Sequence, residues 1–479
     1  MSRRTLTLLF LFIPLISSSQ EKALKLFLAD SAMEHAEVSF CIIDGGSGKT
    51  VFEYNPEKSL VPASVMKLVT SSAALEMLSP DYTFKTSVGY TGSLNRRSGK
   101  LSGDIIIKGG GDPALGSDRF DKYYAGFTDK WVAEIKKLGI RKIEGRIITD
   151  DSYFDYLPVP AKWLWEDAGN YYGAGAYGLS VFDNTYEIHF RTSADSLKQI
   201  ITGITPEECR FEFANWLVAA GTADKGYVFA APYSTNGWLA GSIPVTLDDY
   251  VMKASIADPP LIMAKVIDQK LRSSEISISG KPTTTRLLQS VITDAVTPIA
   301  DIVSPPLKDI VDTLNHESVN LYAEHLAKQL GKTFRNNGST EAGVDVIKGF
   351  LSKTGINTEG MFIEDGSGLS PLDALNAGSV ASLLFYMRSK GHFFDDFYSS
   401  LPEAGKEGTL KNIFSDPVFE GRIKAKSGSM TRVRSYAGYL TTLSDNELIF
   451  CIIVNNFSGP YQDIISHIEE ILKETIQTN

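Results

Sequence analysis

Hydrophobic and polar residues alternate in two short stretches near the start of the chain. The stretches are Ala36–Asp44 and Thr50–Tyr54, and Gly45, Gly46 and Gly48 lie between them. Alternation is the period of a strand with one buried face, and clustered glycines mark a turn. The pattern therefore predicts a pair of β-strands.

The stretch that follows has a helical period. Its apolar residues recur at a helical spacing between Val65 and Leu75, and Pro62 precedes them. A proline is well tolerated at the beginning of a helix, where its missing N–H has no partner to lose. We expect a buried helix over roughly residues 63–77.

The pattern changes between residues 83 and 298. One helix is expected near 119–138 and another at Leu261–Leu271, and residues 171–260 are rich in glycine, tyrosine and short strand-like runs. Further strands are expected at Thr83–Tyr90, Leu101–Lys108, Gly145–Thr149 and Ile276–Thr285.

The chain then returns to long helical runs and ends on strands. Helices are expected from about 299 to 390, two long strands at Lys424–Thr442 and Glu447–Asn455, and a last helix near 460–475. Strands from both ends can join in one antiparallel sheet flanked by helices, which predicts an α/β (α+β) fold.

The middle of the chain is then an insertion into this first domain, since loop closure costs little extra entropy for a long insertion. We expect a first domain of residues 20–84 and 299–479. An inserted α/β domain would comprise 85–170 and 261–298, and a second inserted, β-rich domain 171–260.

The first nineteen residues resemble an export signal rather than part of the fold. Arg3 and Arg4 precede an apolar run from Leu6 to Ile16, and small residues follow. The run is far shorter than the roughly 20 residues that a membrane-spanning helix needs. We expect cleavage near Ser19, with an uncleaved anchor as the alternative, and no later segment is apolar and long enough to span a membrane.

Composition and charge exclude several classes of protein. Of 479 residues, 43% are hydrophobic and 22% charged, which excludes a disordered chain or a small disulfide-stapled module. The net charge of −10 argues against a nucleic-acid-binding protein. The cysteines are odd in number, and Cys41 and Cys451 lie in apolar strand-like runs, so we expect buried free thiols. The six histidines have no metal-ligand spacing, and we expect neither a metal nor a cofactor.

Ser64 and Lys67 carry the first candidate chemistry. Residues three apart on a helix share one face. A serine hydroxyl needs a base to become a nucleophile, and a lysine whose pKa is lowered can be that base. The S-x-x-K pattern also arises by chance, but a lysine on a buried apolar helix needs a partner or a role.

Two further patterns follow later in the chain. Ser318-Val319-Asn320 lies between helical runs, where the alternative interpretation is a helix N-cap or a turn. Lys426-Ser427-Gly428-Ser429 lies in a strand, where Lys426 and Gly428 share a face. A glycine there would let a substrate backbone approach beside a cation, and the alternative is an edge-strand lysine with a bulge glycine.

The order S-x-x-K, S-x-N, K-[ST]-G is that of penicillin-binding proteins and β-lactamases. With these motifs the chain resembles D-alanyl-D-alanine carboxypeptidase/endopeptidases of the penicillin-binding protein 4 type over nearly all of its mature length. Three other segments resemble that family: Gly109–Pro113, Asp365–Ser370 and Leu401–Leu410. The gap of roughly 250 residues between the first two motifs is also similar to that family, because extra domains are inserted there.

The resemblance implies a transpeptidase-like catalytic domain and a set of roles. Ser64 would form an acyl-enzyme with the D-Ala-D-Ala carbonyl, and Lys67 would accept its proton. Ser318 would relay a proton to the leaving amine, Asn320 would hold Lys67 and the substrate amide, and Lys426 would set the local field. Ser427 and Ser429 would help to bind the terminal carboxylate beside Gly428, and the N–H groups of Ser64 and Ser429 would form an oxyanion hole.

The implied substrates are peptidoglycan stem peptides and cross-links, with β-lactams as covalent inhibitors, in the periplasm or cell envelope. Val319 stands where many members of that family have Asp, and Ser427 where many have Thr. The alternatives are another S-x-x-K serine hydrolase, such as an esterase or β-lactamase, and a catalytically weak peptidoglycan-binding scaffold. We expect His316 to be an exposed helix-end residue. Asp150-Asp151 could offer carboxylates to a free amine of a stem peptide, but an acidic turn in water is the simpler interpretation.

Overall fold

The computed structural model describes residues 18–193, 199–210, 212–245 and 248–479. The predicted signal, residues 1–19, therefore lies almost wholly outside the described residues. Within those ranges, no helix combines the length and the apolar character that crossing a bilayer requires.

A five-stranded antiparallel sheet joins the two ends of the chain, as predicted. Its strand order is β19-β20-β21-β1-β2. The strands are β1 (Glu37–Asp44), β2 (Thr50–Tyr54), β19 (Ile423–Met430), β20 (Val433–Thr441) and β21 (Glu447–Asn455).

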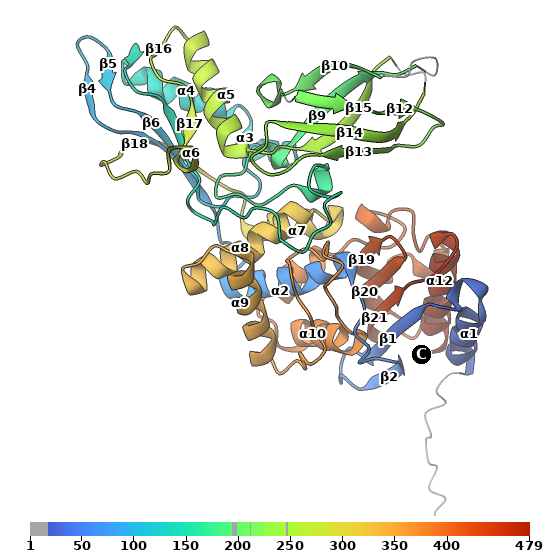
Figure 1. Ribbon diagram of the computed structural model, residues 1–479. Coiled ribbons are helices and arrows are strands. Elements are labelled where there is room, and N and C mark those ends of the chain that lie inside the picture. Colours follow the sequence, from blue (N-terminus) through green and yellow to red (C-terminus); the bar gives the residue numbers. More distant parts are fainter. Residues whose placement is uncertain (1–17, 194–198, 211, 246–247) are drawn as a thin grey trace, which may run out of the picture.

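Helices cover both faces of this sheet (Figure 1). Helices α1 (Ser18–Ala29) and α12 (Tyr461–Thr478) pack together on one face. The other face carries α2 (Met66–Leu78), α7 (Leu307–Glu317), α8 (Asn320–Arg335), α9 (Thr340–Lys353), α10 (Ala377–Lys390) and α11 (Phe394–Ser399). Because both faces are covered, β21 is apolar and buried along nearly its whole length, and Ile452 and Ile453 enter two different cores.

The beginning and the end of the insertion together form a second sheet, of order β17-β8-β6-β3-β18. Helices α4 (Phe127–Lys137) and α5 (Pro259–Ser273) accompany it, with the short helices α3 (Asp121–Tyr124) and α6 (Thr285–Leu288). The strands are β3 (Lys85–Tyr90), β6 (Ile105–Lys108), β8 (Ile147–Asp150), β17 (Thr283–Thr284) and β18 (Thr297–Val303). A smaller sheet comprises β4 (Ser93–Asn95), β5 (Lys100–Ser102), β7 (Lys142–Ile143) and β16 (Ser277–Ile278).

Two more sheets form the rest of the insertion, and in Figure 1 the whole insertion stands above the sheet that joins the chain ends. One contains β9 (Thr185–Arg191), β10 (Ile200–Thr205) and β15 (Tyr250–Ser255). The other contains β11 (Glu212–Asn215), β12 (Val218–Ala219), β13 (Lys225–Phe229) and β14 (Asn236–Ile243). We keep the division into three domains as a proposal that this pairing supports.

Five predicted elements are wrong in detail. The single strand expected at Leu101–Lys108 is two strands, β5 and β6, which belong to different sheets. Residues 299–303 belong to strand β18, which pairs with β3, so helix begins only with α7. The single strand at Lys424–Thr442 is a hairpin, because Arg432 turns the chain at a positive φ of 59°. The helix near 119–138 is interrupted by Gly126 at a φ of 64°, and Ile276–Thr285 holds only the two-residue strands β16 and β17. Cys41 and Cys451 are buried and free, as predicted, and lie opposite each other on β1 and β21.

Candidate active site

Ser64 lies in a short 3₁₀ turn, Ala63–Val65, that leads directly into α2. One helical turn later, the Nζ atom of Lys67 lies 2.9 Å from the Ser64 Oγ atom. The ammonium also donates to the side-chain Oδ1 of Asn320 at 2.6 Å and to the carbonyl of Ser367 at 2.8 Å. The Lys67 side chain is fully buried. These three hydrogen bonds therefore fix the position of its amine.

The loop that contains Gly368 packs against the Ser64 turn. A Cβ atom on Gly368 would lie 2.0 Å from the carbonyl oxygen of Ala63, and Gly368 has a φ of 79°. Both facts require glycine at that position. The Asp365 carboxylate fixes this loop by accepting the backbone N–H groups of Ser367, Gly368 and Ser370 at 2.6–3.0 Å.

The pKa of Lys67 is lowered to about 8 by burial, against the opposing effect of nearby carboxylates, which favour the charged amine. These carboxylates belong to Asp365, Glu324 and Asp373. Burial also raises the pKa of Glu324, whose carboxylate accepts the Gly366 N–H. A lysine with a pKa of about 8 is neutral often enough near neutral pH to accept a proton.

Ser318 and Asn320 lie at the junction of α7 and α8. Ser318 has a left-handed backbone with a φ of 59°, and α8 has Val319 at its N-cap, so the predicted alternative of a Ser318 N-cap is wrong. Asn320 opens α8, and its Nδ2 atom donates to the carbonyl of Tyr172 at 2.9 Å. The amide of Asn320 thus joins Lys67 to the inserted part of the chain.

Lys426 approaches Ser318 from strand β19. Its Nζ atom donates to the Ser318 Oγ atom and to the Ser427 carbonyl, both at 2.9 Å. Strand β19 is an edge strand, yet the Lys426 side chain is fully buried. Burial, and then the charge of Lys67, lowers the pKa of Lys426 well below its usual range. Two lysines with lowered pKa values therefore serve one cluster.

The residues after Lys426 have three different environments. The Ser427 Oγ atom donates to the Thr409 Oγ1 atom at 2.8 Å, and the exposed Ser429 hydroxyl accepts a guanidinium N–H of Arg434 at 2.6 Å. A Cβ on Gly428 would lie 2.6 Å from the Pro62 carbonyl oxygen. Glycine there lets β19 pack against the protein's own Ser64 turn, which differs from the expected opening for a substrate backbone.

Five motif residues therefore form two hydrogen-bonded groups. Ser64, Lys67 and Asn320 make one, and Ser318 and Lys426 make the other. Sequence reasoning missed the partners Tyr172, Ser367, Thr409 and Arg434. Two of these act through backbone carbonyls and carry no side-chain signal, although Ser367 and Thr409 lie in segments that resemble the family.

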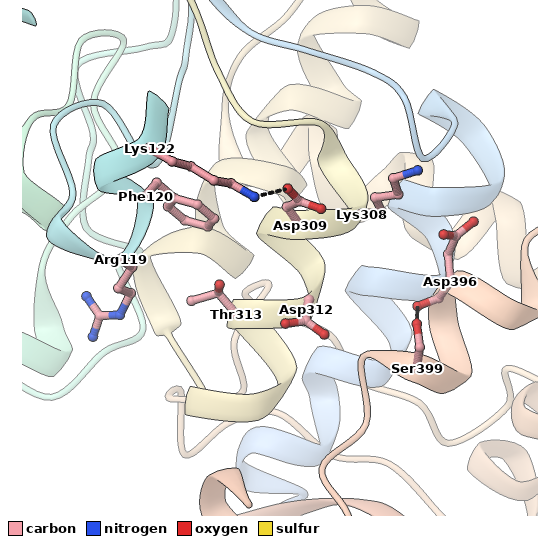
Figure 2. A pocket seen from close by; sticks show the side chains of 9 residues that line it. All are labelled: Arg119, Phe120, Lys122, Lys308, Asp309, Asp312, Thr313, Asp396 and Ser399. Carbon is pink, nitrogen blue, oxygen red and sulfur yellow. Dashed lines mark hydrogen bonds and ion pairs between the residues drawn. The ribbon is translucent and has the colours of Figure 1, made fainter. Parts of the chain in front are cut away.

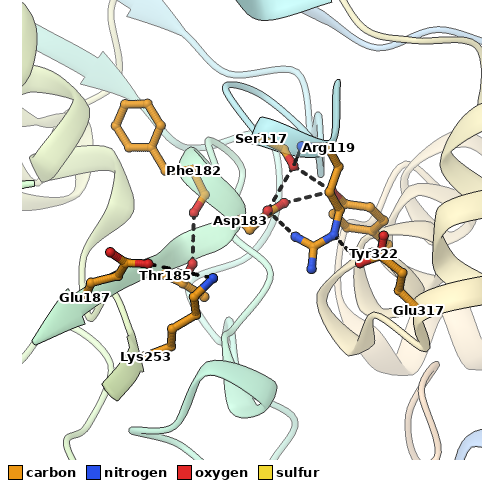
Figure 3. A network of polar contacts seen from close by, with 9 residues as sticks. All are labelled: Ser117, Arg119, Phe182, Asp183, Thr185, Glu187, Lys253, Glu317 and Tyr322. Atoms are coloured by element: carbon orange, nitrogen blue, oxygen red, sulfur yellow. Dashed lines mark hydrogen bonds and ion pairs between the residues drawn. The ribbon is translucent and has the colours of Figure 1, made fainter. Parts of the chain in front are cut away.

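A polar network in the inserted part holds the chain on both sides of Ser318 (Figure 3). The Arg119 guanidinium forms ion pairs with Asp183 and with Glu317, the latter at 2.6 Å. The buried Tyr322 hydroxyl donates to Asp183 at 2.7 Å. Glu317 precedes Ser318 and Tyr322 stands two residues after Asn320, so both ends of the Ser318–Asn320 segment are tied to one carboxylate–guanidinium pair.

A polar pocket of about 380 Å³ lies on the outer side of α7 (Figure 2). Both signs of charge line it, including Lys122, Lys308 and Asp309, with Lys122 paired to Asp309. None of the predicted site residues lines this pocket. It is therefore separate from the cluster around Ser64.

Two expectations about neighbouring residues are wrong. His316 ends α7 but is half-buried, and its ring contacts the Glu407 carboxylate at 3.3 Å. Asp150 and Asp151 are buried rather than in an aqueous turn. Asp151 accepts the Thr285 hydroxyl at 2.8 Å, and Asp150 accepts that of Ser152, so both carboxylates are held by their own chain.

The chain is similar to known proteins over almost its whole length. Residues 20–475 match the model of the D-Ala-D-Ala carboxypeptidase 3 (S13) family. The D-alanyl-D-alanine carboxypeptidase of Actinomadura sp. (strain R39) is 30% identical over 448 residues, which cover 90% of this chain and 80% of the relative. D-alanyl-D-alanine carboxypeptidase DacB of Haemophilus influenzae is 23% identical, covering 90% and 88%.

Solved structures agree on the fold. The crystal structure of penicillin binding protein 4 (dacB) from Haemophilus influenzae superposes with a TM-score of 0.77 at 21% identity, covering 92% of this chain and 95% of that one. The predatory endopeptidase Bd3459 from Bdellovibrio bacteriovorus gives a TM-score of 0.51 at 16% identity, covering 92% and 93%. With the family model matching almost the whole chain, the chain belongs to the D-Ala-D-Ala carboxypeptidase 3 (S13) family of serine peptidases.

Proposed function

We propose that Ser64 is the nucleophile of this carboxypeptidase, and that its substrates are the stem peptides and cross-links of peptidoglycan. The single observation that carries the proposal is the contact of 2.9 Å between a buried lysine amine and the Ser64 hydroxyl. A neutral Lys67 can take the hydroxyl proton while the oxygen attacks the D-Ala-D-Ala carbonyl. No histidine or metal is needed for this step.

The rest of the cluster fits the second half of the reaction. When the C–N bond breaks, the leaving amine needs a proton. The Ser318 hydroxyl, which is held by Lys426, can relay to that amine the proton that Lys67 took from Ser64. Asn320 holds Lys67 in line, and Ser427 and Ser429 offer hydroxyls to the terminal carboxylate near Arg434. Water then attacks the acyl carbon, and Ser64 recovers its proton as the ester bond breaks.

We extend the proposal to cleavage of cross-links, to β-lactam acylation and to a periplasmic or envelope location. A structural neighbour from Bdellovibrio is described as an endopeptidase, and penicillin binding protein 4 from Haemophilus influenzae was crystallised with a β-lactam. Both neighbours share the fold of this chain. The extension rests on that shared fold together with the cluster around Ser64.

The test compares the parent with Ser64→Ala. We expect the parent to bind fluorescent penicillin covalently and to release D-Ala from a stem pentapeptide, and Ser64→Ala to do neither at an unchanged melting temperature. Digestion of purified dimeric muropeptides checks the cross-link activity separately. Turnover retained by Ser64→Ala would assign the nucleophile elsewhere, and a folded parent without turnover would favour a binding scaffold.

A further inference from the structure

One face of a sheet in the insertion exposes a row of aromatic rings. We call Trp165, Trp216, Tyr227, Phe229 and Trp238 the aromatic face. Trp165 is 54% exposed, Trp216 63% and Tyr227 38%, while the other two are half-buried. Large exposed aromatic side chains that gather in one place are informative, because a soluble protein normally leaves such surface only where something binds.

The rings lie on the outer side of strands β13 and β14. Val228 and Leu239 pair across these strands and are fully buried in the core below. Because side chains alternate, Phe229 and Trp238, the next pair in the register, point the other way. Their rings stack with centroids 5.3 Å apart and planes at 12°, so they form one aromatic platform on the outer side of the two strands.

The platform extends on both sides of this stacked pair. The Tyr227 ring lies 6.2 Å from that of Phe229, and the Trp165 ring lies 6.1 Å from that of Trp238. Trp216 follows β11, whose Ala214 is in register with Trp238, and it lies two residues on from Ala214 along the same face.

One segment, residues 163–173, connects this platform to the active site. At its first residue, the Trp163 Nε1 atom donates to Asp365, and near its other end the Tyr172 carbonyl accepts from Asn320. In between, the Asn170 Oδ1 atom accepts the Val228 N–H of β13 at 3.1 Å. Trp165 in the same segment contacts Trp238, so the aromatic face is continuous with the wall of the catalytic cluster.

We propose that the aromatic face binds the glycan strand of the polymer whose stem peptide occupies the active site. Pyranose rings present a face of C–H bonds, which matches the negative face of an aromatic ring, and their hydroxyls suit polar groups at the edge of a platform. Exposed Glu212, Lys225 and Asn236 lie on the strands that carry the platform. The inference rests on the proposed function, because only a substrate attached to sugar would reach both sites.

Such a second site raises the local concentration of stem peptides around Ser64. Binding one part of a polymer makes the next encounter intramolecular, and effective concentrations in the millimolar range are typical of short flexible connections. The face therefore favours polymeric over soluble substrates. It leaves the chemistry at Ser64 unchanged.

The experiment uses four variants in parallel: Trp165→Ala/Trp238→Ala, Trp216→Ala, Trp238→Phe, and Phe334→Ala as a control. Phe334 is 43% exposed on α8, so it matches the lost apolar surface without belonging to the aromatic face. Each change is also placed in a Ser64→Ala background and assayed by co-sedimentation with purified insoluble peptidoglycan. Quenching of tryptophan fluorescence by a β-1,4-linked N-acetylglucosamine hexamer measures sugar binding directly.

We expect the double variant to bind peptidoglycan and the hexamer about tenfold more weakly, since it loses two stacking rings. Trp216→Ala should show a smaller loss, and Trp238→Phe and Phe334→Ala should bind like the parent. Release of D-Ala from a soluble tripeptide ending in D-Ala-D-Ala should stay within about twofold in all variants with Ser64 intact.

The two proposals fail in different ways. A parent that cleaves the soluble tripeptide, with all variants sedimenting equally, overturns the glycan proposal alone. Sedimentation that falls in the double variant without any hexamer binding also overturns it, because the aromatic face then contacts the peptide part of peptidoglycan rather than the sugar. A parent that fails to cleave the tripeptide overturns the proposed function, whatever the sedimentation shows.

Discussion

The Nζ atom of Lys426 lies 2.9 Å from the Oγ atom of Ser318, although 108 positions separate them in the chain. A second buried lysine, Lys67, makes the equivalent contact with Ser64. Each serine hydroxyl therefore has its own amine. We interpret the two pairs as the two ends of one proton path, from the attacking hydroxyl to the leaving amine.

Acylation should depend on pH through Lys67. Burial lowers its pKa to about 8, and only the neutral amine accepts a proton, so the rate should rise with pH and level off above about 8. Below that midpoint the rate should fall about tenfold per pH unit. The acylation rate can be measured at each pH by stopped flow with a chromogenic cephalosporin. A rate that is flat from pH 6 to 9 would contradict the assignment of Lys67 as the base.

Val319→Asp should move that midpoint and also stabilise the fold. Val319 is the N-cap of α8 and makes no side-chain cap hydrogen bond. Aspartate there can accept a free N–H group of the first turn, which is worth about 1 kcal/mol. Its charge beside the two lysines should raise the pH midpoint of acylation by about one unit.

The control for this change is Val319→Asn, which caps the helix without the charge. It should raise the melting temperature by about 2–4 °C, as Val319→Asp does, and leave the pH midpoint where it was. Equal midpoints for the Asp and Asn variants would show that the charge does not reach Lys67.

Arg119 should support catalysis although it lies outside the cluster. It pairs with Glu317, next to Ser318, and with Asp183, which holds Tyr322 (Figure 3). Arg119→Ala should lower kcat about tenfold with little change in KM, because a small displacement of Ser318 slows proton transfer.

A double-variant cycle separates this role from general destabilisation. If Arg119 acts through Glu317, adding Glu317→Gln to Arg119→Ala should cost little more. Arg119→Lys should recover only part of the rate, since lysine lacks the planar fork that reaches two carboxylates. Fully additive losses in kcat would argue that Arg119 has no link to Ser318 through Glu317.

Ser427 should tolerate threonine but not alanine. Its hydroxyl donates to Thr409, and threonine keeps that group. Ser427→Thr should retain kcat/KM within about threefold, whereas Ser427→Ala should lose about tenfold on a substrate with a free carboxylate. The same two variants tested on a C-terminally amidated peptide should differ less. An Ala variant as active as the parent on both peptides would remove Ser427 from carboxylate binding.

Gly428→Ala should damage both stability and acylation. The added methyl group would meet the Ser435 hydroxyl and the Pro62 carbonyl, so β19 must move away from the Ser64 turn. We expect a cost of about 1–3 kcal/mol in the free energy of unfolding, measured by urea denaturation. Gly349→Ala is the matched control, because Gly349 lies in α9 with open space around it. That change should stabilise by about 0.5–1 kcal/mol.

Local patterns predicted the elements that carry the motifs, but not all of the boundaries. The strands around Cys41 and the helix after Ser64 were predictable because their periods are regular. The hairpin at Arg432 was missed because no glycine, proline or asparagine marks it. Strand β18 was missed because Ile299, Ile302 and Val303 also fit a helical spacing.

The site shows the same division between local and distant information. Ser64 and Lys67 could be paired from spacing alone, because the 3₁₀ turn that holds Ser64 runs directly into α2, which holds Lys67. The carbonyl of Tyr172 that holds Asn320 comes from a distant loop, and the Ser367 carbonyl depends on how the Asp365 loop folds. Backbone groups brought together by tertiary structure have no signature in a residue pattern.

Strand β1 has its neighbour β21 about 400 residues further along the chain, and Lys426 lies only just before β21. As the polypeptide is synthesised, Ser64 emerges early, while Lys426 and the three strands that complete the sheet, β19 to β21, come last. If the proposed function holds, we expect the chain to be inert towards the cell wall until its synthesis is almost complete. Any product truncated before residue 447 lacks the strand that joins the two ends of the sheet and should be removed by proteases rather than cut the wall.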